Sequence, residues 1–124
     1  LYCMEEPENG IHPANLPSMV RLVQDLTVDT SEEPGTDNPF RQIIINTHSP
    51  AVVQIVGAED LLFATTASRR TPDGTVSRGL QLRPLADTWR AAATSEDTAF
   101  TKADILPYLV SPPGAQLTLD WEAA

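Results

Sequence analysis

Two short apolar segments, each followed at once by polar residues, constrain the fold of this chain most. The first covers residues 1–4 and ends at the adjacent carboxylates Glu5 and Glu6. The second covers residues 43–45 and ends at Asn46, Thr47 and His48. Short, continuously apolar strands are typical of parallel sheets that are covered on both faces. We therefore expect two buried, parallel strands with polar tips.

The segment between these strands predicts a helix. Asn15 is a suitable N-cap, and Pro17 falls in the first turn, where its missing N–H does no harm. Apolar residues then recur with helical spacing, at Leu16, Met19, Val20, Val23 and Leu26. Residues 29–39 are acidic and rich in turn-forming residues, which predicts a solvated loop.

The chain continues with a second helix and a third strand. Ser49 and Pro50 are typical of a helix start, with Ser as the cap and Pro at the first helical position. We expect a short helix over residues 51–56 that stops at Gly57, and a strand over residues 61–65. Because strands and helices alternate, we expect a parallel sheet with right-handed crossovers.

The pattern changes after residue 65. The turn formed by residues 71–74 (Thr-Pro-Asp-Gly) and the alternation over residues 76–82 predict an antiparallel hairpin. Residues 86–94 fit a short helix, and residues 116–121 fit an edge strand. Thr101 and Asp104 resemble a capping box that opens a helix as far as Leu109.

Composition excludes several functions for this segment. The 124 residues fit one domain or one lobe of a domain, and the net charge of −9 with only eight Lys and Arg disfavours nucleic-acid binding. A single cysteine, Cys3, excludes a disulfide within the chain and fits a reducing cytoplasm. No apolar run is long enough to cross a membrane.

The polar tips of the strands are candidate functional positions. In open α/β sheets, ligands bind beyond the carboxyl ends of the strands. Two carboxylates there, Glu5 and Glu6, can hold a divalent cation and activate a water molecule. Taken alone, the pair also fits an ordinary solvated strand end, and a lone histidine such as His48 is more often a structural hydrogen-bonding group.

Taken together, the two motifs resemble a known family. Residues 3–13 read Cys-Met-Glu-Glu-Pro-Glu-Asn-Gly-Ile-His-Pro, and residues 45–50 read Ile-Asn-Thr-His-Ser-Pro about 35 residues later. Their order and spacing resemble the Walker B/D-loop and the H-loop of ABC-type ATPases, most closely the stand-alone, RecF/SMC-like predicted AAA-type ATPases. The resemblance covers about the first 65 residues.

The resemblance implies a fold. The chain would be an α/β protein: a partial P-loop NTPase (ABC-type) parallel sheet with flanking helices, followed by a β-hairpin and short C-terminal helices. Residues 1–65 would be the Walker B to H-loop lobe, and residues 66–124 a C-terminal extension of the same domain.

The resemblance also implies roles for individual residues. Glu5 would hold Mg²⁺ largely through water, although the family usually has Asp there. Glu6 would be the catalytic glutamate, and His48 would contact the γ-phosphate of ATP. Asn9 and Gly10 would lie in the D-loop, which crosses a dimer interface in the family; an ordinary Asn-Gly turn is the equal alternative.

One part of the family's machinery is absent from these residues. No Gly-x-x-x-x-Gly-Lys-Ser/Thr phosphate loop occurs, so we expect the C-terminal portion of a longer ATPase, inactive alone. The complete protein would bind ATP and Mg²⁺, form an ATP-dependent homodimer, and act in DNA maintenance or defence rather than transport. Nucleic acid would be bound outside this segment.

Other interpretations stay open. One is a non-catalytic regulatory or interaction module that keeps the fold, and another is the ATPase part of an overcoming-lysogenization-defect (OLD) type nuclease. His12 fits a structural role at the loop-to-helix junction better than a catalytic one. Cys3, His12 and His48 could contribute to a zinc site, but no fourth ligand has suitable spacing.

Overall fold

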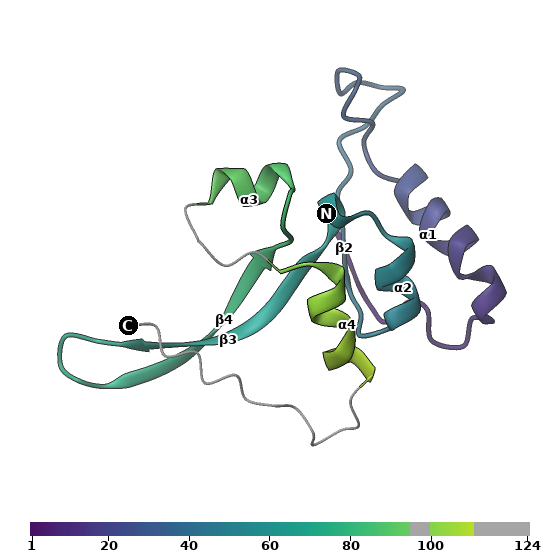
Figure 1. The fold of residues 1–124 in the computed structure, drawn as a ribbon. Helices are drawn as coiled ribbons and strands as arrows, with labels where there is room; N and C mark the ends of the chain where they lie inside the picture. Colours follow the sequence, from purple (N-terminus) through teal and green to yellow (C-terminus); the bar gives the residue numbers. More distant parts are fainter. Residues whose placement is uncertain (95–99, 111–124) are drawn as a thin grey trace. The chain divides into compact units, whose positions relative to one another are not determined.

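The computed structural model describes residues 1–94 and 100–110 (Figure 1). The chain divides into two compact units, Leu1–Val56 and Gly57–Ala124. No helix of the described residues is long and apolar enough to cross a membrane.

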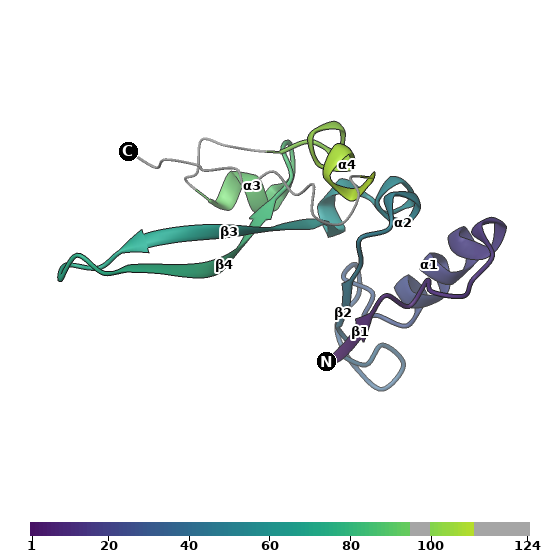
Figure 2. The same cartoon turned by 90° about the horizontal axis from the view of Figure 1, so that it is seen from below.

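The first unit is a small α/β layer. Strands β1 (Tyr2–Glu5) and β2 (Ile43–Asn46) pair in parallel, and Figure 2 shows them side by side. Helix α1 (Leu16–Asp25) lies between them in sequence, and helix α2 (Pro50–Ile55) follows β2. The two helices contact each other and supply the buried side chains of this unit: Leu16, Val20, Val52 and Val53.

Local signals explain where both helices begin. Ser49 caps α2, because its Oγ accepts a hydrogen bond from the backbone N–H of Val52. Asn15 occupies the predicted N-cap of α1, but its side chain makes no capping bond. Instead, a 3₁₀ turn over Pro13–Asn15 leads into the helix, and His12 Nδ1 accepts the N–H of Ala14. His12 therefore fixes the loop-to-helix junction, as the structural interpretation of this residue predicts.

The prediction that both faces of the parallel strands are buried is wrong for the described residues. Met4, Ile43 and Ile45 are half-buried, whereas Cys3 and Ile44 on the opposite face are exposed. Ile44 keeps 52% of its surface accessible. A continuous apolar run specifies a strand that needs cover on both faces, but it does not specify which segment supplies that cover.

The loop between α1 and β2 contains neither a helix nor a strand over residues 29–39, as predicted. Asn38 orders it, since its side chain accepts the N–H of Asp29 and donates to the carbonyl of Asp29. Asp29 also accepts hydrogen bonds from the hydroxyl and then the N–H of Ser31, which lower the pKa of its exposed carboxyl.

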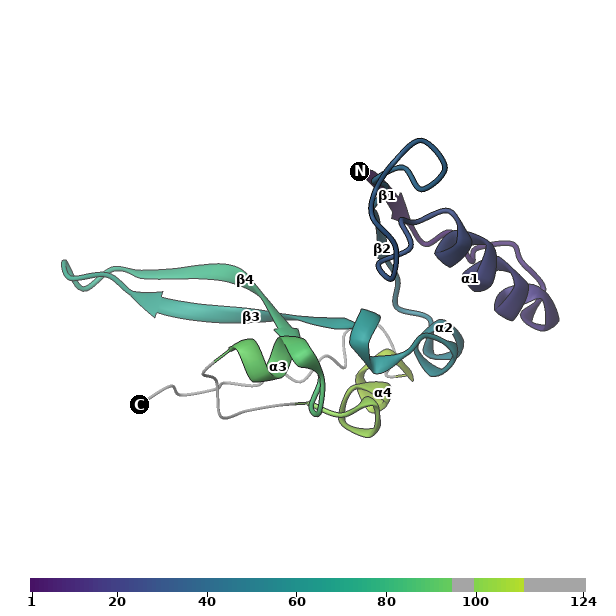
Figure 3. The ribbon, with the colours of Figure 1, turned by 90° about the horizontal axis from the view of Figure 1, so that it is seen from above.

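The second unit is built on an antiparallel hairpin. After a 3₁₀ turn (Ala58–Asp60), strands β3 (Leu62–Arg70) and β4 (Val76–Pro84) pair along their whole length (Figure 3). The predicted turn joins them: the N–H of Gly74 donates to the carbonyl of Thr71, and Gly74 adopts φ +85°. Asp73 accepts hydrogen bonds from the Thr71 hydroxyl and the Thr75 N–H, which lower its pKa.

The prediction of a third parallel strand over residues 61–65 is wrong. The residues expected to extend the parallel sheet instead begin β3, which pairs antiparallel with β4 in a separate sheet. Residue 65, the last residue of the predicted Walker B to H-loop lobe, lies inside this strand. The nearby turn at residues 71–74 favours this pairing because it brings adjacent segments together at little entropic cost.

Short helices complete the second unit. Helix α3 (Trp89–Ala93) is capped by Thr88, and α4 is Lys102–Val110. The predicted capping box is present, because the Thr101 N–H donates to Asp104 at 2.7 Å and the Asp104 N–H donates to the Thr101 hydroxyl at 3.3 Å. Aromatic contacts join Phe63 of β3 to Phe100 and Tyr108. The edge strand predicted at residues 116–121 lies outside the described residues.

Candidate functional site

The carboxyl ends of β1 and β2 lie at one edge of the parallel sheet. Glu5 is paired in register with Asn46, and the N–H of Glu6 donates to the Asn46 carbonyl at 2.8 Å. The loops that leave the two strands are therefore held together by backbone pairing. Residues about 40 positions apart in sequence become neighbours for this reason.

Glu6 is the centre of the side-chain contacts at this edge. Its Oε1 lies 2.5 Å from His48 Nε2, and its Oε2 accepts a hydrogen bond of 2.7 Å from Asn9 Nδ2. The Glu6 side chain is 24% exposed and that of His48 is 75% exposed. Both carboxylate oxygens of Glu6 are thus engaged, while the imidazole stays open to solvent.

The backbone of Glu6 turns sharply at this point. Its φ of 45° lies in the left-handed region, which is uncommon for residues other than glycine. Strained backbone of this kind concentrates at functional sites, where the surrounding structure holds it in place. Here the conformation ends β1 and starts the turn that carries Asn9.

The turn itself has a defined geometry. The N–H of Asn9 donates to the Glu6 carbonyl and the N–H of Ile11 donates to the Glu8 carbonyl, each at 3.0 Å. Gly10 adopts φ +83°, which a side chain would strain. Asn9 therefore joins the Glu6–His48 group directly, whereas Gly10 shapes the turn and contributes no side chain.

Glu5 is exposed at the end of β1, on the same sheet face as Cys3. Among the described residues, no hydrogen bond or ion pair connects Glu5 to the group formed by Glu6, Asn9 and His48. Likewise, no three His, Cys, Asp or Glu side chains of the described residues form a metal-binding cluster. An exposed carboxylate can still contribute one ligand to a Mg²⁺ ion that is otherwise bound by water and phosphate.

Two further residues meet at this edge, Glu8 and Thr47, and neither was predicted as a site residue. The Thr47 hydroxyl donates to Glu8 Oε1 and accepts the N–H of Ser49 at 3.1 Å. Glu8 belongs to the first motif (residues 3–13) and Thr47 to the second (residues 45–50). This membership was the only signal in the sequence that either residue lies at the site. Nothing in the sequence shows that the two side chains meet.

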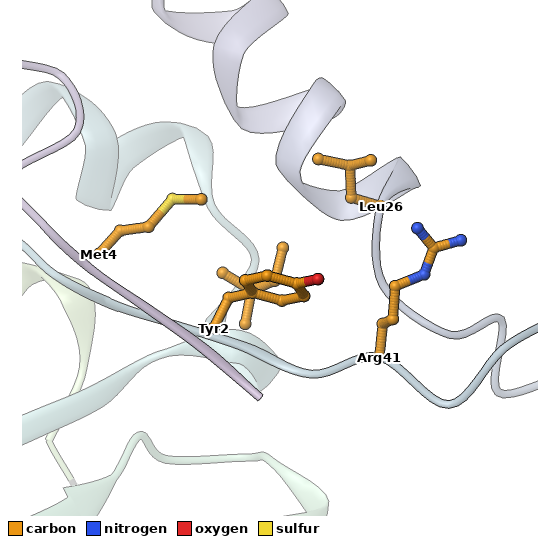
Figure 4. Close-up of a pocket in the computed structure, with 5 residues that line it drawn as sticks. Tyr2, Met4, Leu26 and Arg41 are labelled. Atoms are coloured by element: carbon orange, nitrogen blue, oxygen red, sulfur yellow. The ribbon is translucent and has the colours of Figure 1, made fainter.

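A cavity of about 220 Å³ lies elsewhere in the first unit. Figure 4 shows Tyr2, Met4, Leu26 and Arg41 around it, and Ile43 completes the lining. Tyr2 and Ile43 begin β1 and β2, whereas Glu6 and His48 follow the ends of these strands. The cavity is therefore separate from the Glu6–His48 group.

The residues of this edge lie in a segment that matches a known protein family. Residues 1–54 match an AAA domain family whose description also names the AbiEii toxin of a type IV toxin–antitoxin system. No curated protein and no solved structure matches the chain. The matched residues include Glu6, Asn9 and His48, so the group lies in an AAA, P-loop ATPase-like region. This match supports nucleotide binding and an ATPase-type function in general.

Proposed function

We propose that this chain supplies the Walker B to H-loop part of an ABC-type, RecF/SMC-like ATPase. The observation that carries the proposal is the 2.5 Å contact between Glu6 and His48 at the carboxyl ends of two parallel strands. The two residues come from the two motifs that resemble the family, and ligands of open α/β sheets bind at this edge. The AAA domain match over the same residues supports the proposal.

In this proposal Glu6 is the general base of hydrolysis. Its carboxylate accepts a proton from the attacking water or orients that water toward the γ-phosphate. His48 contacts the γ-phosphate through its exposed imidazole, which is the only side chain of the pair that is largely open to solvent. Asn9 holds the second oxygen of Glu6, which fixes the direction of the carboxylate.

Glu5 is the proposed Mg²⁺ ligand. Its carboxylate is exposed at the strand end, and hard oxygen ligands of this type suit Mg²⁺. When bound, Mg²⁺ neutralises charge on the nucleotide phosphates. Because Glu is one methylene longer than the Asp usual in the family, it reaches farther from the strand.

The remaining parts of the site lie outside these residues. The sequence contains no phosphate-binding loop of the Gly-x-x-x-x-Gly-Lys-Ser/Thr type, so another segment supplies that function. We propose that Asn9 and Gly10 face a second subunit across an ATP-dependent dimer. Nucleic acid, where the complete protein binds it, would be held by another segment, because this one carries a net charge of −9.

The test is Glu6→Gln in the complete protein. The amide keeps the size of the side chain but accepts no proton at neutral pH, so hydrolysis should fall at least ~100-fold. MgATP binding should persist, and the ATP-bound dimer should accumulate and be visible by size exclusion with MgATP. The matched control is Glu32→Gln, which changes an exposed carboxylate in the loop between α1 and β2. Wild-type hydrolysis by Glu6→Gln would refute the assignment.

A non-catalytic module is the second candidate. It is favoured by the engagement of both Glu6 oxygens and by Glu in place of Asp at position 5. Under this alternative, the complete protein would bind MgATP, and the substitution Glu6→Gln would not lower its rate of ATP hydrolysis. The same experiment therefore separates the two functions.

A further inference from the structure

Glu8 is a partly buried carboxylate for which the proposed chemistry has no use. Its Oε1 accepts the hydroxyl of Thr47, whereas its Oε2 is buried and accepts no hydrogen bond from the residues that the structure describes. Burying a polar atom without a partner is costly. We therefore expect this partly buried carboxylate to have a structural role, and its hydrogen bond with Thr47 indicates what that role is.

The contact ties the two loops of the site together. Glu8 lies two residues after Glu6, and Thr47 lies one residue before His48. The Thr47 hydroxyl also accepts the N–H of Ser49, so the hydroxyl holds the backbone on both sides of His48. Ser49 in turn caps α2, which connects the loop to a fixed helix end.

His48 needs this support because little else holds its ring. Three-quarters of its side chain is exposed, so packing contributes little to its position. The contact with Glu6 then depends on where the backbone of residues 47–49 lies. A displacement of about an ångström or more there would lengthen the 2.5 Å contact between Nε2 of His48 and Oε1 of Glu6 beyond hydrogen-bond distance.

We propose that Glu8 and Thr47 form a positioning pair that holds His48 against Glu6. In this proposal the two side chains contact neither the attacking water nor the phosphates of ATP. They act by fixing the loop that carries His48. The inference rests on the proposed function for its effect on hydrolysis, but the contact itself is open to a test that needs no nucleotide.

The nucleotide-free test measures how fast diethyl pyrocarbonate modifies His48. The reagent reacts mainly at Nε2, the less hindered ring nitrogen, and only when that nitrogen carries no proton, so a hydrogen bond from Nε2–H to Glu6 should slow the reaction. In the complete protein, Thr47→Val should raise the modification rate at His48 several-fold, read by mass spectrometry of the peptide. Thr47→Ser, which keeps the hydroxyl, should retain the slow rate. His12, in the same chain, is the internal reference.

The kinetic test uses the same variants. Thr47→Val should lower kcat for ATP hydrolysis on the order of 10-fold to 100-fold, as expected for a misplaced catalytic group, with little change in KM. Glu8→Leu should lower kcat by a similar factor. The double variant that combines Thr47→Val and Glu8→Leu should lower kcat no further than either substitution alone, because both remove the same hydrogen bond. Thr27→Val removes a hydroxyl hydrogen bond at the end of α1 and should leave kcat unchanged.

The outcomes separate the inference from the proposed function. If Glu6→Gln stops hydrolysis while Thr47→Val neither exposes His48 to the reagent nor lowers kcat, the positioning pair is refuted and the proposed function stands. If Thr47→Val exposes His48 but Glu6→Gln hydrolyses ATP normally, the contact is real and the proposed function is refuted. Loss of activity in Thr47→Ser equal to that in Thr47→Val would also overturn the positioning role.

Discussion

The two compact units bring their strands together in different ways, and this difference decides which residues become neighbours. In the first unit, β1 and β2 are parallel and are separated by 37 residues that include α1. Their carboxyl ends therefore place Glu6 and Asn9 beside His48. In the second unit, β3 and β4 are consecutive strands joined by a short turn. The hairpin brings together only residues that are already near each other in sequence.

The hairpin carries charge and apolar surface. Arg69, Arg70 and Arg78 lie near its tip, and its paired residues Arg70 and Val76 lie on the same face as Leu80 and Leu82. Leu80 is 75% exposed. Parallel pairing gathers functional groups from distant segments at one edge, whereas hairpin pairing stabilises a local ribbon. The comparison predicts that substitutions in the two units have different kinds of effect.

The largest expected difference concerns hydrolysis. In the complete protein, His48→Gln should lower kcat on the order of 100-fold, the usual cost of losing one group that stabilises developing charge. Arg78→Gln, in the hairpin, should leave kcat unchanged because its side chain is remote from the paired strand ends in sequence and belongs to another sheet. Steady-state ATPase measurements check both. An equal loss of kcat in His48→Gln and Arg78→Gln would contradict the predicted difference between the two units.

The next effect concerns the stability of the hairpin. Gly74 adopts φ +85°, so Gly74→Ala should lower the free energy of unfolding by roughly 1–2 kcal/mol, the cost of a left-handed conformation for an L-residue. Gly79 is the matched control, because it lies in β4 without a positive φ and has open space around its Cβ position. Urea unfolding should show a loss for Gly74→Ala and none for Gly79→Ala. ATP hydrolysis at low urea should be unaffected by either.

The smallest effect is the pH dependence of the capping box that starts α4. The Thr101 N–H, and then the Thr101 hydroxyl, hold the pKa of Asp104 below its ordinary value of 3.8. A carboxyl with a lowered folded-state pKa contributes stability above its unfolded pKa and loses it as pH falls through the folded value. Wild type should therefore lose slightly more stability than Asp104→Asn as the pH falls below 3.8. Identical urea midpoints for the two proteins across that range would contradict the role of the box.

Several local features could be predicted from the sequence. The Ser49 cap, the turn at Thr71 and Gly74, and the Thr101–Asp104 box all occur where predicted. Each depends on residues within four positions of one another, so the sequence contains the complete interaction. The two motifs also indicated one shared edge for Glu6 and His48, because parallel strands bring their carboxyl ends together.

Pairing between strands could be predicted only in part, since the parallel pair of β1 and β2 and a hairpin across residues 71–74 occur as expected. Residues 61–65 were expected to extend the parallel sheet, but the strand that contains them, β3, pairs with β4. A short apolar run fits either sheet, and the pattern along one strand does not identify its neighbour. Similarly, the apolar run at residues 43–45 predicted burial on both faces, whereas Ile44 is exposed.

The sequence by itself determined the local elements of this protein: where helices begin, where turns fall, and which residue types stand at the strand ends. Only the tertiary structure decided that Thr47 meets Glu8, that both oxygens of Glu6 are engaged, and that Glu5 stands apart from this group. The physical reason is distance along the chain. Caps and turns are short-range interactions of neighbouring residues, whereas the site depends on the register of two strands about 40 residues apart.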